Sequence, residues 1–96
     1  MYCVITYDVN TETKEGRRRL RLVAKACESR GQRAQLSVFE VSVNRVQFEA
    51  LRHRLLDIID PREDSLRIYH LVEPHADHIE SYGRRTVIDF DEPMIV

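Results

Sequence analysis

The first clear pattern of polar and apolar positions is in residues 2–9, YCVITYDV. Apolar or β-favouring side chains occupy both alternating sets of positions, which predicts a strand that is covered on both faces and lies inside a sheet. The one carboxylate, Asp8, is costly to bury without a partner. Two hypotheses for Asp8 are therefore open: it is a turn or cap residue for the next helix, or it is a metal ligand.

An amphipathic helix is predicted over residues 14–30, because apolar residues recur at i, i+3, i+4 and i+7 from Leu20 to Cys27. Gly31 follows the last turn and is expected to be the C′ residue of this helix. Three polar residues are candidates for its N-cap: Asn10, Thr11 and Thr13.

Residues 33–43 alternate again. This stretch is too long and uninterrupted for a tight hairpin, since it contains no Asn-Gly or Asp-Gly, and we expect one bent strand or two short strands broken near Leu36–Ser37. Asn44 is expected to cap a second helix over residues 45–60, with Pro61 just beyond it. Further strands are predicted over residues 65–72 and 86–90.

This order of elements predicts a single domain over residues 1–96 with a ferredoxin-like α+β sandwich fold, βαββαβ, and an extra C-terminal strand. In such a fold both helices cover one face of an antiparallel sheet. The other face would be bare although several strands place apolar side chains on it, so a second layer is needed. We therefore predict a homodimer that packs through this face.

The net charge of −1 conceals a marked asymmetry. Residues 14–33 contain eight basic and two acidic residues, a local charge of +6, whereas residues 57–96 contain ten acidic residues and four arginines, a local charge of −6. The basic segment is suited to a phosphate backbone. No apolar run approaches the roughly 20 residues of a membrane helix. Strand-like sequence begins at residue 2 and the two cysteines lack a metal spacing, so we expect no signal peptide, buried free thiols and a cytoplasmic location.

Candidate chemistry is sparse. The chain contains no HExxH, Walker loop, nucleophile elbow or zinc-finger spacing, and the spacing of His70, His75 and His78 matches no standard ligand pattern. Hydrolysis of a phosphodiester needs a metal held by carboxylates and cations that neutralise the phosphate. One Asp8 supplies too few ligands for Mg²⁺, but two Asp8 side chains meeting in a symmetric dimer would share one ion. The alternative for the arginines of the first helix is a solvated helix face.

Several stretches resemble a known family. These are YDV at 7–9, GRRRLRLVAKAC at 16–27, GQRAQLSVFE at 31–40, LRHRLLDIID at 51–60 and DSLRIY at 64–69. Together they are similar to the Cas-two family of small CRISPR-associated proteins, which partner the integrase in spacer acquisition during antiviral defence. The similarity is strongest to the variety that accompanies type I-C systems.

The resemblance implies a ferredoxin-like homodimer in which the two Asp8 residues bind one Mg²⁺, and a metal-dependent endonuclease acting on RNA or double-stranded DNA. In the implied mechanism Arg17, Arg19 and Arg33 hold the phosphate backbone while Ser37 donates a hydrogen bond near the phosphate. The catalytic candidates are Tyr7, Asp8, Ser37 and Phe39. The candidates for nucleic-acid binding are Arg17, Arg18, Arg19, Arg21, Lys25 and Arg33.

A competing hypothesis is a non-catalytic scaffold. The dimer would hold a DNA duplex between two integrase dimers, and residues 82–96 would form a strand and tail that reach the dimer or integrase partner. Phosphate neutralisation would then fall to Arg17, Arg18, Arg21 and Lys25, and Asp8 would be dispensable. A small-molecule regulatory module on the same fold is a third hypothesis, but the sequence contains no ligand-specific set of residues for it.

Overall fold

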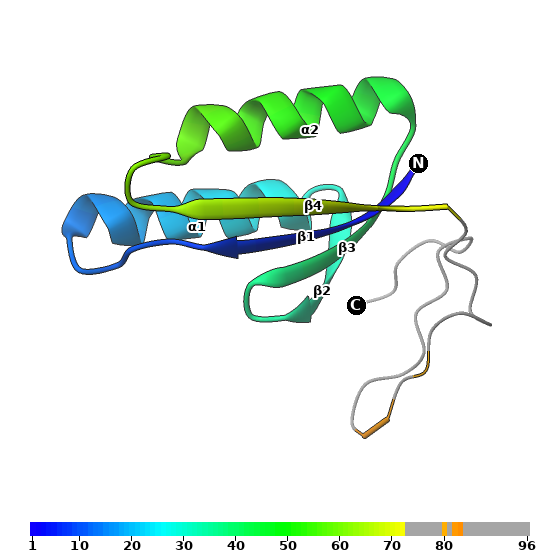
Figure 1. Cartoon of the computed structure of the whole chain (residues 1–96), viewed down its shortest axis with the longest axis horizontal. Helices are drawn as coiled ribbons and strands as arrows, with labels where there is room; N and C mark the ends of the chain where they lie inside the picture. The colour runs from blue at the N-terminus through cyan, green and yellow to red at the C-terminus, as the bar shows by residue number, and fades with distance from the viewer. Residues whose placement is uncertain (73–79, 81, 84–96) are drawn as a thin grey trace.

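The structure is a computed structural model that describes residues 1–72, 80, 82 and 83. The expected strand over 86–90, the tail beyond it, His75 and His78 lie outside the described residues. Within them the chain forms four strands and two helices (Figure 1). In chain order the elements are β1 (Tyr2–Asp8), α1 (Lys14–Glu28), β2 (Gly31–Gln35), β3 (Val38–Ser42), α2 (Arg45–Ile58) and β4 (Ser65–Leu71).

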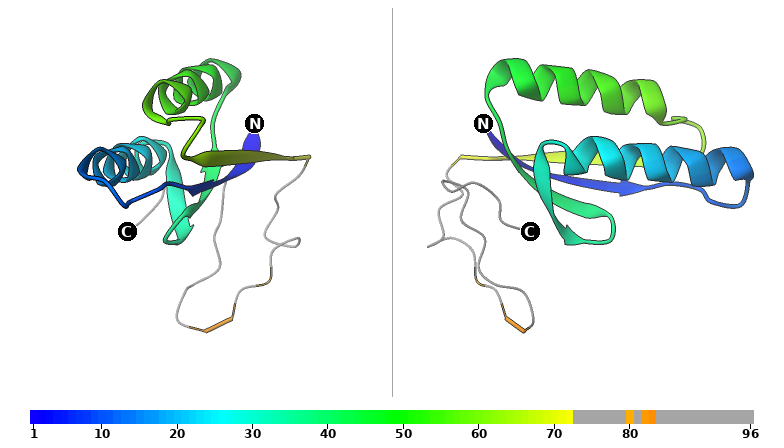
Figure 2. Two further views of the ribbon diagram at one scale, coloured as in Figure 1. Left: turned by 60° about the vertical axis from the view of Figure 1, so that its left-hand side comes forward. Right: turned by 180° about the vertical axis from the view of Figure 1, so that it is seen from behind.

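The four strands form one antiparallel sheet in the order β2-β3-β1-β4. Both helices lie on the same side of this sheet (Figure 2). The arrangement is the ferredoxin-like α+β fold that the sequence predicts. β1 lies between β3 and β4, which confirms the central position inferred from its two apolar faces.

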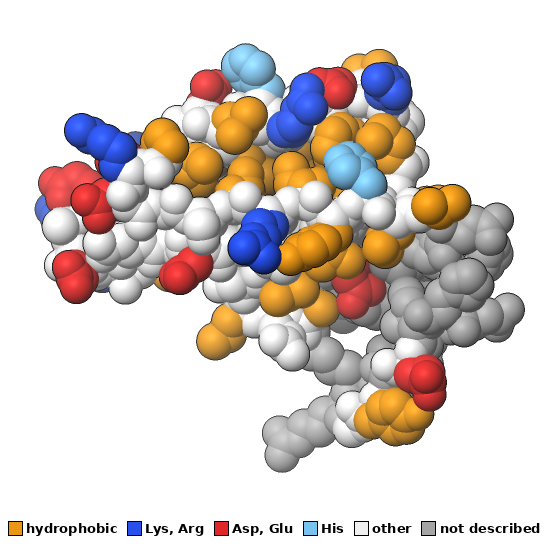
Figure 3. Space-filling view, viewed as in Figure 1, with side chains coloured by type: hydrophobic (Ala, Val, Ile, Leu, Met, Phe, Trp, Pro, Cys, Tyr) orange, Lys and Arg blue, Asp and Glu red, His pale blue; other side chains and the backbone are white. Residues whose placement is uncertain are grey.

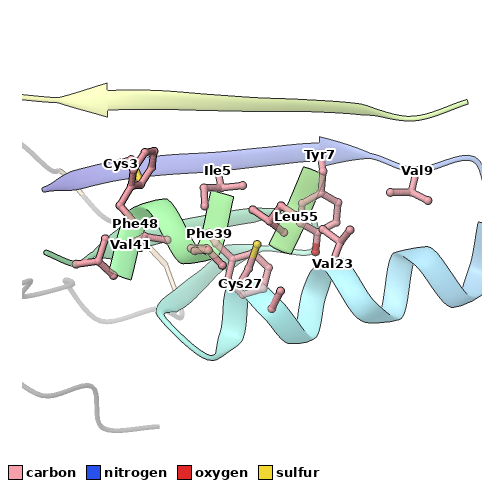
Figure 4. Close-up of a cluster of buried hydrophobic side chains, with 13 residues drawn as sticks. Cys3, Ile5, Tyr7, Val9, Val23, Cys27, Phe39, Val41, Phe48 and Leu55 are labelled. Carbon is pink, nitrogen blue, oxygen red and sulfur yellow. The ribbon is translucent and has the colours of Figure 1, made fainter. Parts of the chain in front are cut away.

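The core fills the space between the sheet and the helices. Cys3, Ile5 and Tyr7 point from β1 toward the helical layer, where they meet buried side chains of both helices (Figure 4). Both cysteines are free and buried, as predicted, and burial raises the pKa of the Cys27 thiol to about 12. The alternate residues of β1 therefore face the opposite side of the sheet.

Helix α1 starts where Thr13 caps it, since the Thr13 side chain accepts a hydrogen bond from the Gly16 amide. The expectation that Gly31 is the C′ residue of this helix is wrong, because the helix ends at Glu28 with Ser29 as its C-cap. Gly31 begins β2, and among the described residues the only glycine with positive φ is Gly83. A Cβ on Gly31 would lie 2.7 Å from the Glu40 carbonyl oxygen, so glycine is needed there because β3 approaches closely.

The stretch after α1 is a tight hairpin, which contradicts the prediction that no tight hairpin forms there. β2 and β3 are separated by the two-residue turn Leu36–Ser37, the position at which a break was expected. No described non-glycine residue has positive φ, so the turn is not one of the usual left-handed hairpin turns. The register shifts between Arg33 and Gln35, and this bulge adds the twist that the turn does not supply.

Helix α2 has the cap predicted for it. The Asn44 side chain accepts from the Gln47 amide, and the Gln47 side chain accepts from the Asn44 amide, which completes a capping box. The buried residues of this helix are Phe48, Leu51 and Leu55.

Candidate functional site

Asp8 is exposed at the end of β1, on the side of the sheet opposite α1 and α2. We call this side the open face. The cross-strand register places Ser65 of β4 opposite Asp8, Arg67 opposite Thr6 and Tyr69 opposite Val4. Because directly paired residues project to the same side of a sheet, these β4 side chains share the open face with Asp8.

Arg67 and Tyr69 were missed in the sequence analysis. The Arg67 guanidinium donates to the Tyr69 hydroxyl at 3.3 Å, and both side chains are exposed. The sequence does show that these two residues share a face, because the period of two in SLRIYHL places Ser65, Arg67 and Tyr69 on one side of the strand. What the sequence could not supply is the register that brings this side next to Asp8.

Tyr7, Phe39 and Arg33 lie on the other side of the sheet, beneath the helices. Phe39 has no exposed surface and its ring stacks with that of Tyr7, with 6.2 Å between the ring centroids. The Arg33 guanidinium lies 5.1 Å from the centre of the Phe39 ring and forms an ion pair with Glu28 at 2.9 Å. The pKa of Tyr7 is raised, chiefly by burial. These three residues support the sheet from behind Asp8.

Ser37 lies next to the end of β1. Its backbone carbonyl accepts a hydrogen bond from the Tyr7 amide at 3.2 Å, and the Tyr7 hydroxyl donates to the carbonyl of Leu36 at 3.3 Å. The β2–β3 turn is therefore attached to β1 at the residue before Asp8. Tyr7 positions this turn through its backbone and its side chain.

The exposed basic residues of α1 lie in the helical layer and not on the open face. Arg17, Arg18, Arg21 and Lys25 are exposed along this helix. Arg19 differs from them, because it is only 18% exposed and forms an ion pair with Asp64. The structure thus places the basic helix and the Asp8 side chain on opposite sides of the sheet (Figure 2), and it brings Arg19 to a carboxylate.

The described residues of one chain offer little for holding a metal. No group of three or more His, Cys, Asp or Glu side chains comes together among them. His70 faces the helical layer, where its ring contacts Phe48 at 5.2 Å between centroids. Mg²⁺ is commonly bound by one or two carboxylates together with water and substrate phosphates. The exposed Asp8 fits this ligand set if two copies each contribute one carboxylate.

The open face also carries apolar surface. The space-filling view looks onto β4 with α2 above it, and hydrophobic side chains lie on both sides of this strand, toward α2 and away from it (Figure 3). Tyr69 is 49% exposed and Leu71 is 36% exposed, although both are large apolar side chains of a sheet. In the part of the chain that the structure describes, neither helix is long and apolar enough to cross a bilayer.

Comparison with known proteins identifies similar chains. Residues 1–79 match the family model described as CRISPR associated protein Cas2. A protein of Moorella thermoacetica named CRISPR-associated endoribonuclease Cas2 1 is 57% identical over 96 residues, which is 100% of both chains. A protein of Halalkalibacterium halodurans named CRISPR-associated endonuclease Cas2 is 45% identical over 95 residues, 99% of both chains. The crystal structure of Streptococcus pyogenes Cas2 matches with a TM-score of 0.76 and 51% identity, covering 86% of this chain and 100% of that one.

Proposed function

The chain belongs to the Cas2 family of CRISPR-associated proteins, and from this premise we propose that it is a Mg²⁺-dependent endonuclease that works with the CRISPR integrase in spacer acquisition. Its substrate would be the phosphodiester backbone of RNA or double-stranded DNA. The names of its relatives, endoribonuclease and endonuclease, support a nuclease role. The observation that carries the proposal is the exposed carboxylate of Asp8 on the open face.

The active form in this proposal is a homodimer that packs open face to open face. Such packing would cover the exposed apolar surface of Tyr69 and Leu71. In a two-fold interface a residue near the axis meets its own counterpart, so the two Asp8 carboxylates would come together. A site with one carboxylate from each chain would be incomplete in the monomer.

The chemistry follows from these positions. The two Asp8 carboxylates would hold one Mg²⁺, which when bound supplies charge neutralisation at the scissile phosphate and a more acidic water. Arg67 shares the open face with Asp8 and is exposed, so its guanidinium is available to a phosphate oxygen. Contacts of this kind are made to the backbone and not to base edges, so we expect cleavage with little sequence preference.

The test is cleavage by Asp8→Asn, measured on single-stranded RNA and on duplex DNA with Mg²⁺ present. We expect activity below about 1% of wild type, since even the outer-shell partners of metal ligands are worth 10- to 100-fold. Asp57→Asn is the matched control, because Asp57 is an exposed carboxylate on α2 with 72% of its side-chain surface accessible. Chelation should abolish wild-type cleavage and Mg²⁺ should restore it. Undiminished cleavage by Asp8→Asn would contradict the proposal.

A second candidate function is a DNA-holding scaffold between integrase dimers. The observation in its favour is that Arg17, Arg18, Arg21 and Lys25 are exposed on the layer opposite Asp8, so a duplex bound there needs no cleavage site. The two functions separate in cells that carry Asp8→Asn. If spacer acquisition survives while the integrase still co-purifies, the scaffold is the biological role. If acquisition fails although the complex still forms, the nuclease activity is the biological role.

A further inference from the structure

The carboxylate of Asp64 joins three segments of the chain beside the end of β1. Its side chain has no exposed surface. It accepts hydrogen bonds from the Asn10 amide at 3.1 Å, the Asp60 amide at 2.9 Å and the Arg19 guanidinium, at 2.8 Å from Nε and 3.2 Å from Nη2. These donors belong to the loop after Asp8, to the α2–β4 connection and to α1. An ionised carboxylate in this position is fully satisfied.

The loop between Asp8 and α1 is held at further points. The Asn10 side chain donates to Glu63 at 2.8 Å, and Arg17 donates to the Thr11 carbonyl at 3.2 Å. A Cβ on Gly16 would lie 1.8 Å from the Asn10 carbonyl oxygen, so the first turn of α1 presses directly on this loop. Asn10 is two residues beyond Asp8, and the same contacts therefore fix where the end of β1 lies.

Arg19 directs two of its guanidinium nitrogens, Nε and Nη2, into the protein. Two guanidinium nitrogens form a forked pair with the two oxygens of Asp64, the strongest arrangement available to this pair. If Arg19 turned to a substrate phosphate, Asp64 would remain as a buried carboxylate without its cation, which is strongly unfavourable. The four other basic residues of α1 that we consider for nucleic-acid binding are exposed and carry no such cost.

We propose that Arg19 and Asp64 are a positioning pair for the Asp8 site, and that Arg19 serves cleavage through Asp64 and not through contact with a phosphate. This inference rests on the proposed nuclease function. Asp64 thereby becomes a residue of functional importance, although the sequence analysis gives it no role of its own. Its effect is transmitted through the Asn10 amide to the strand end that carries Asp8.

The experiment is a double-mutant cycle of Arg19→Gln and Asp64→Asn in the full-length protein. Each single variant should lower kcat by about 10- to 100-fold, the range found for outer-shell partners of metal ligands. The double variant should be no worse than either single one, because both remove the same interaction. The Asn10 amide should exchange with solvent faster in both variants, as followed by NMR. The slope of log K against log salt for duplex binding should stay at the wild-type value.

The conservative variant Arg19→Lys sharpens the test. Lysine keeps the charge for a phosphate but cannot form the fork with Asp64, so kcat should still fall. The control pair is Arg52→Gln and Glu49→Gln, an exposed ion pair on α2, which should leave kcat and the salt slope unchanged.

The inference is overturned if Arg19→Gln lowers the salt slope by about 0.9, the value of one phosphate contact. It is also overturned if Asp64→Asn or Arg19→Lys cleaves at the wild-type rate. If Asp64→Asn does not fold, Arg19→Lys decides the question alone. Failure of the nuclease proposal is recognised separately, because Asp8→Asn would then cleave as well as wild type. The salt slope of duplex binding and the exchange rate of the Asn10 amide would still report on the Arg19–Asp64 pair.

Discussion

Tyr7 and Asp8 are adjacent in the chain but act on opposite sides of the sheet. Successive side chains of a strand alternate, so the Tyr7 ring enters the core and the Asp8 carboxylate reaches the open face. Arg33 and Phe39 lie on the same side of the sheet as the Tyr7 ring, since both pack beneath the helices. Under the proposed nuclease function, substitutions at these two positions should therefore affect cleavage by two routes: at Asp8 through loss of the proposed metal ligand, and at Tyr7 through loss of support for the strand.

The stability that Asp64 contributes should depend on pH. Its pKa in the folded protein is lowered from 3.8, first by the hydrogen bond from Arg19 and further by the Asp60 and Asn10 amides. Because the pKa of Asp64 is lower in the folded than in the unfolded protein, its contribution to the free energy of unfolding is complete above about pH 6. The contribution is lost as the pH falls, first through the pKa of the unfolded state and then through the lower pKa of the folded state. The free energy of unfolding of wild type should therefore exceed that of Asp64→Asn at pH 7, and the difference should shrink toward pH 2.

This pH dependence is measured by urea denaturation at a series of pH values. Val46→Ala is a control, because Val46 is 79% exposed and uncharged, and its difference from wild type should not change with pH. A difference between wild type and Asp64→Asn that stays constant from pH 7 to acid would show that the ionised carboxylate is not the stabilising form.

At the scale of elements, Phe39 anchors the β2–β3 hairpin in the hydrophobic core. Phe39 is completely buried on β3. Its ring stacks with the Tyr7 ring and lies against the Arg33 guanidinium. We predict that Phe39→Ala lowers the free energy of unfolding by about 3–5 kcal/mol, the usual cost of truncating a buried phenylalanine. Lost cleavage should then parallel the unfolded fraction, as followed by circular dichroism and activity across temperature.

The matched control for Phe39→Ala is Leu36→Ala in the same hairpin. Leu36 is 82% exposed in the turn, so its truncation should change the free energy of unfolding by less than about 0.5 kcal/mol. A Phe39→Ala protein that keeps wild-type stability and yet loses cleavage would instead assign Phe39 a direct part in the reaction.

The elements that could be predicted are those with a local cause. Thr13 and Asn44 cap the two helices because a short polar side chain satisfies the free amides of a first turn, and this is visible in the sequence. A break at Leu36–Ser37 was one of two predicted alternatives, but the tight hairpin was wrongly excluded, because its twist comes from a bulge at Arg33 and not from a glycine. Asp64 was missed for a different reason, since its partners Arg19 and Asn10 are 45 and 54 residues away and no sequence spacing shows them.

At the scale of the whole molecule, the exposed basic residues of α1 and the exposed apolar side chains of β4 lie on opposite sides of the sheet. The helical layer exposes the basic residues of α1, whereas the open face combines Asp8 with exposed Tyr69 and Leu71. The net charge of −1 hides the basic surface of α1, because the acidic segment 57–96 offsets the basic segment 14–33. One surface is suited to a phosphate backbone and the other to a second copy of the chain.

The division of surfaces predicts that Tyr69→Asp dissociates the proposed dimer. Tyr69 lies on the edge strand β4 and is 49% exposed, so a charge there is tolerated by the monomer but would be buried without a partner at a dimer interface. The affinity of the two copies should fall by at least about 100-fold, since burying an unpaired charge costs several kcal/mol. Light scattering at micromolar concentration should then give a monomer mass.

Leu56→Asp is the control for this substitution. Leu56 is 56% exposed on α2, in the helical layer, so an added charge there should leave the dimer intact. If the Asp8 site needs both copies, Tyr69→Asp should also lose cleavage, and raising its concentration until the dimer forms again should restore it. A Tyr69→Asp protein that stays dimeric would place the interface elsewhere, and one that cleaves as a monomer would show that a single Asp8 is sufficient.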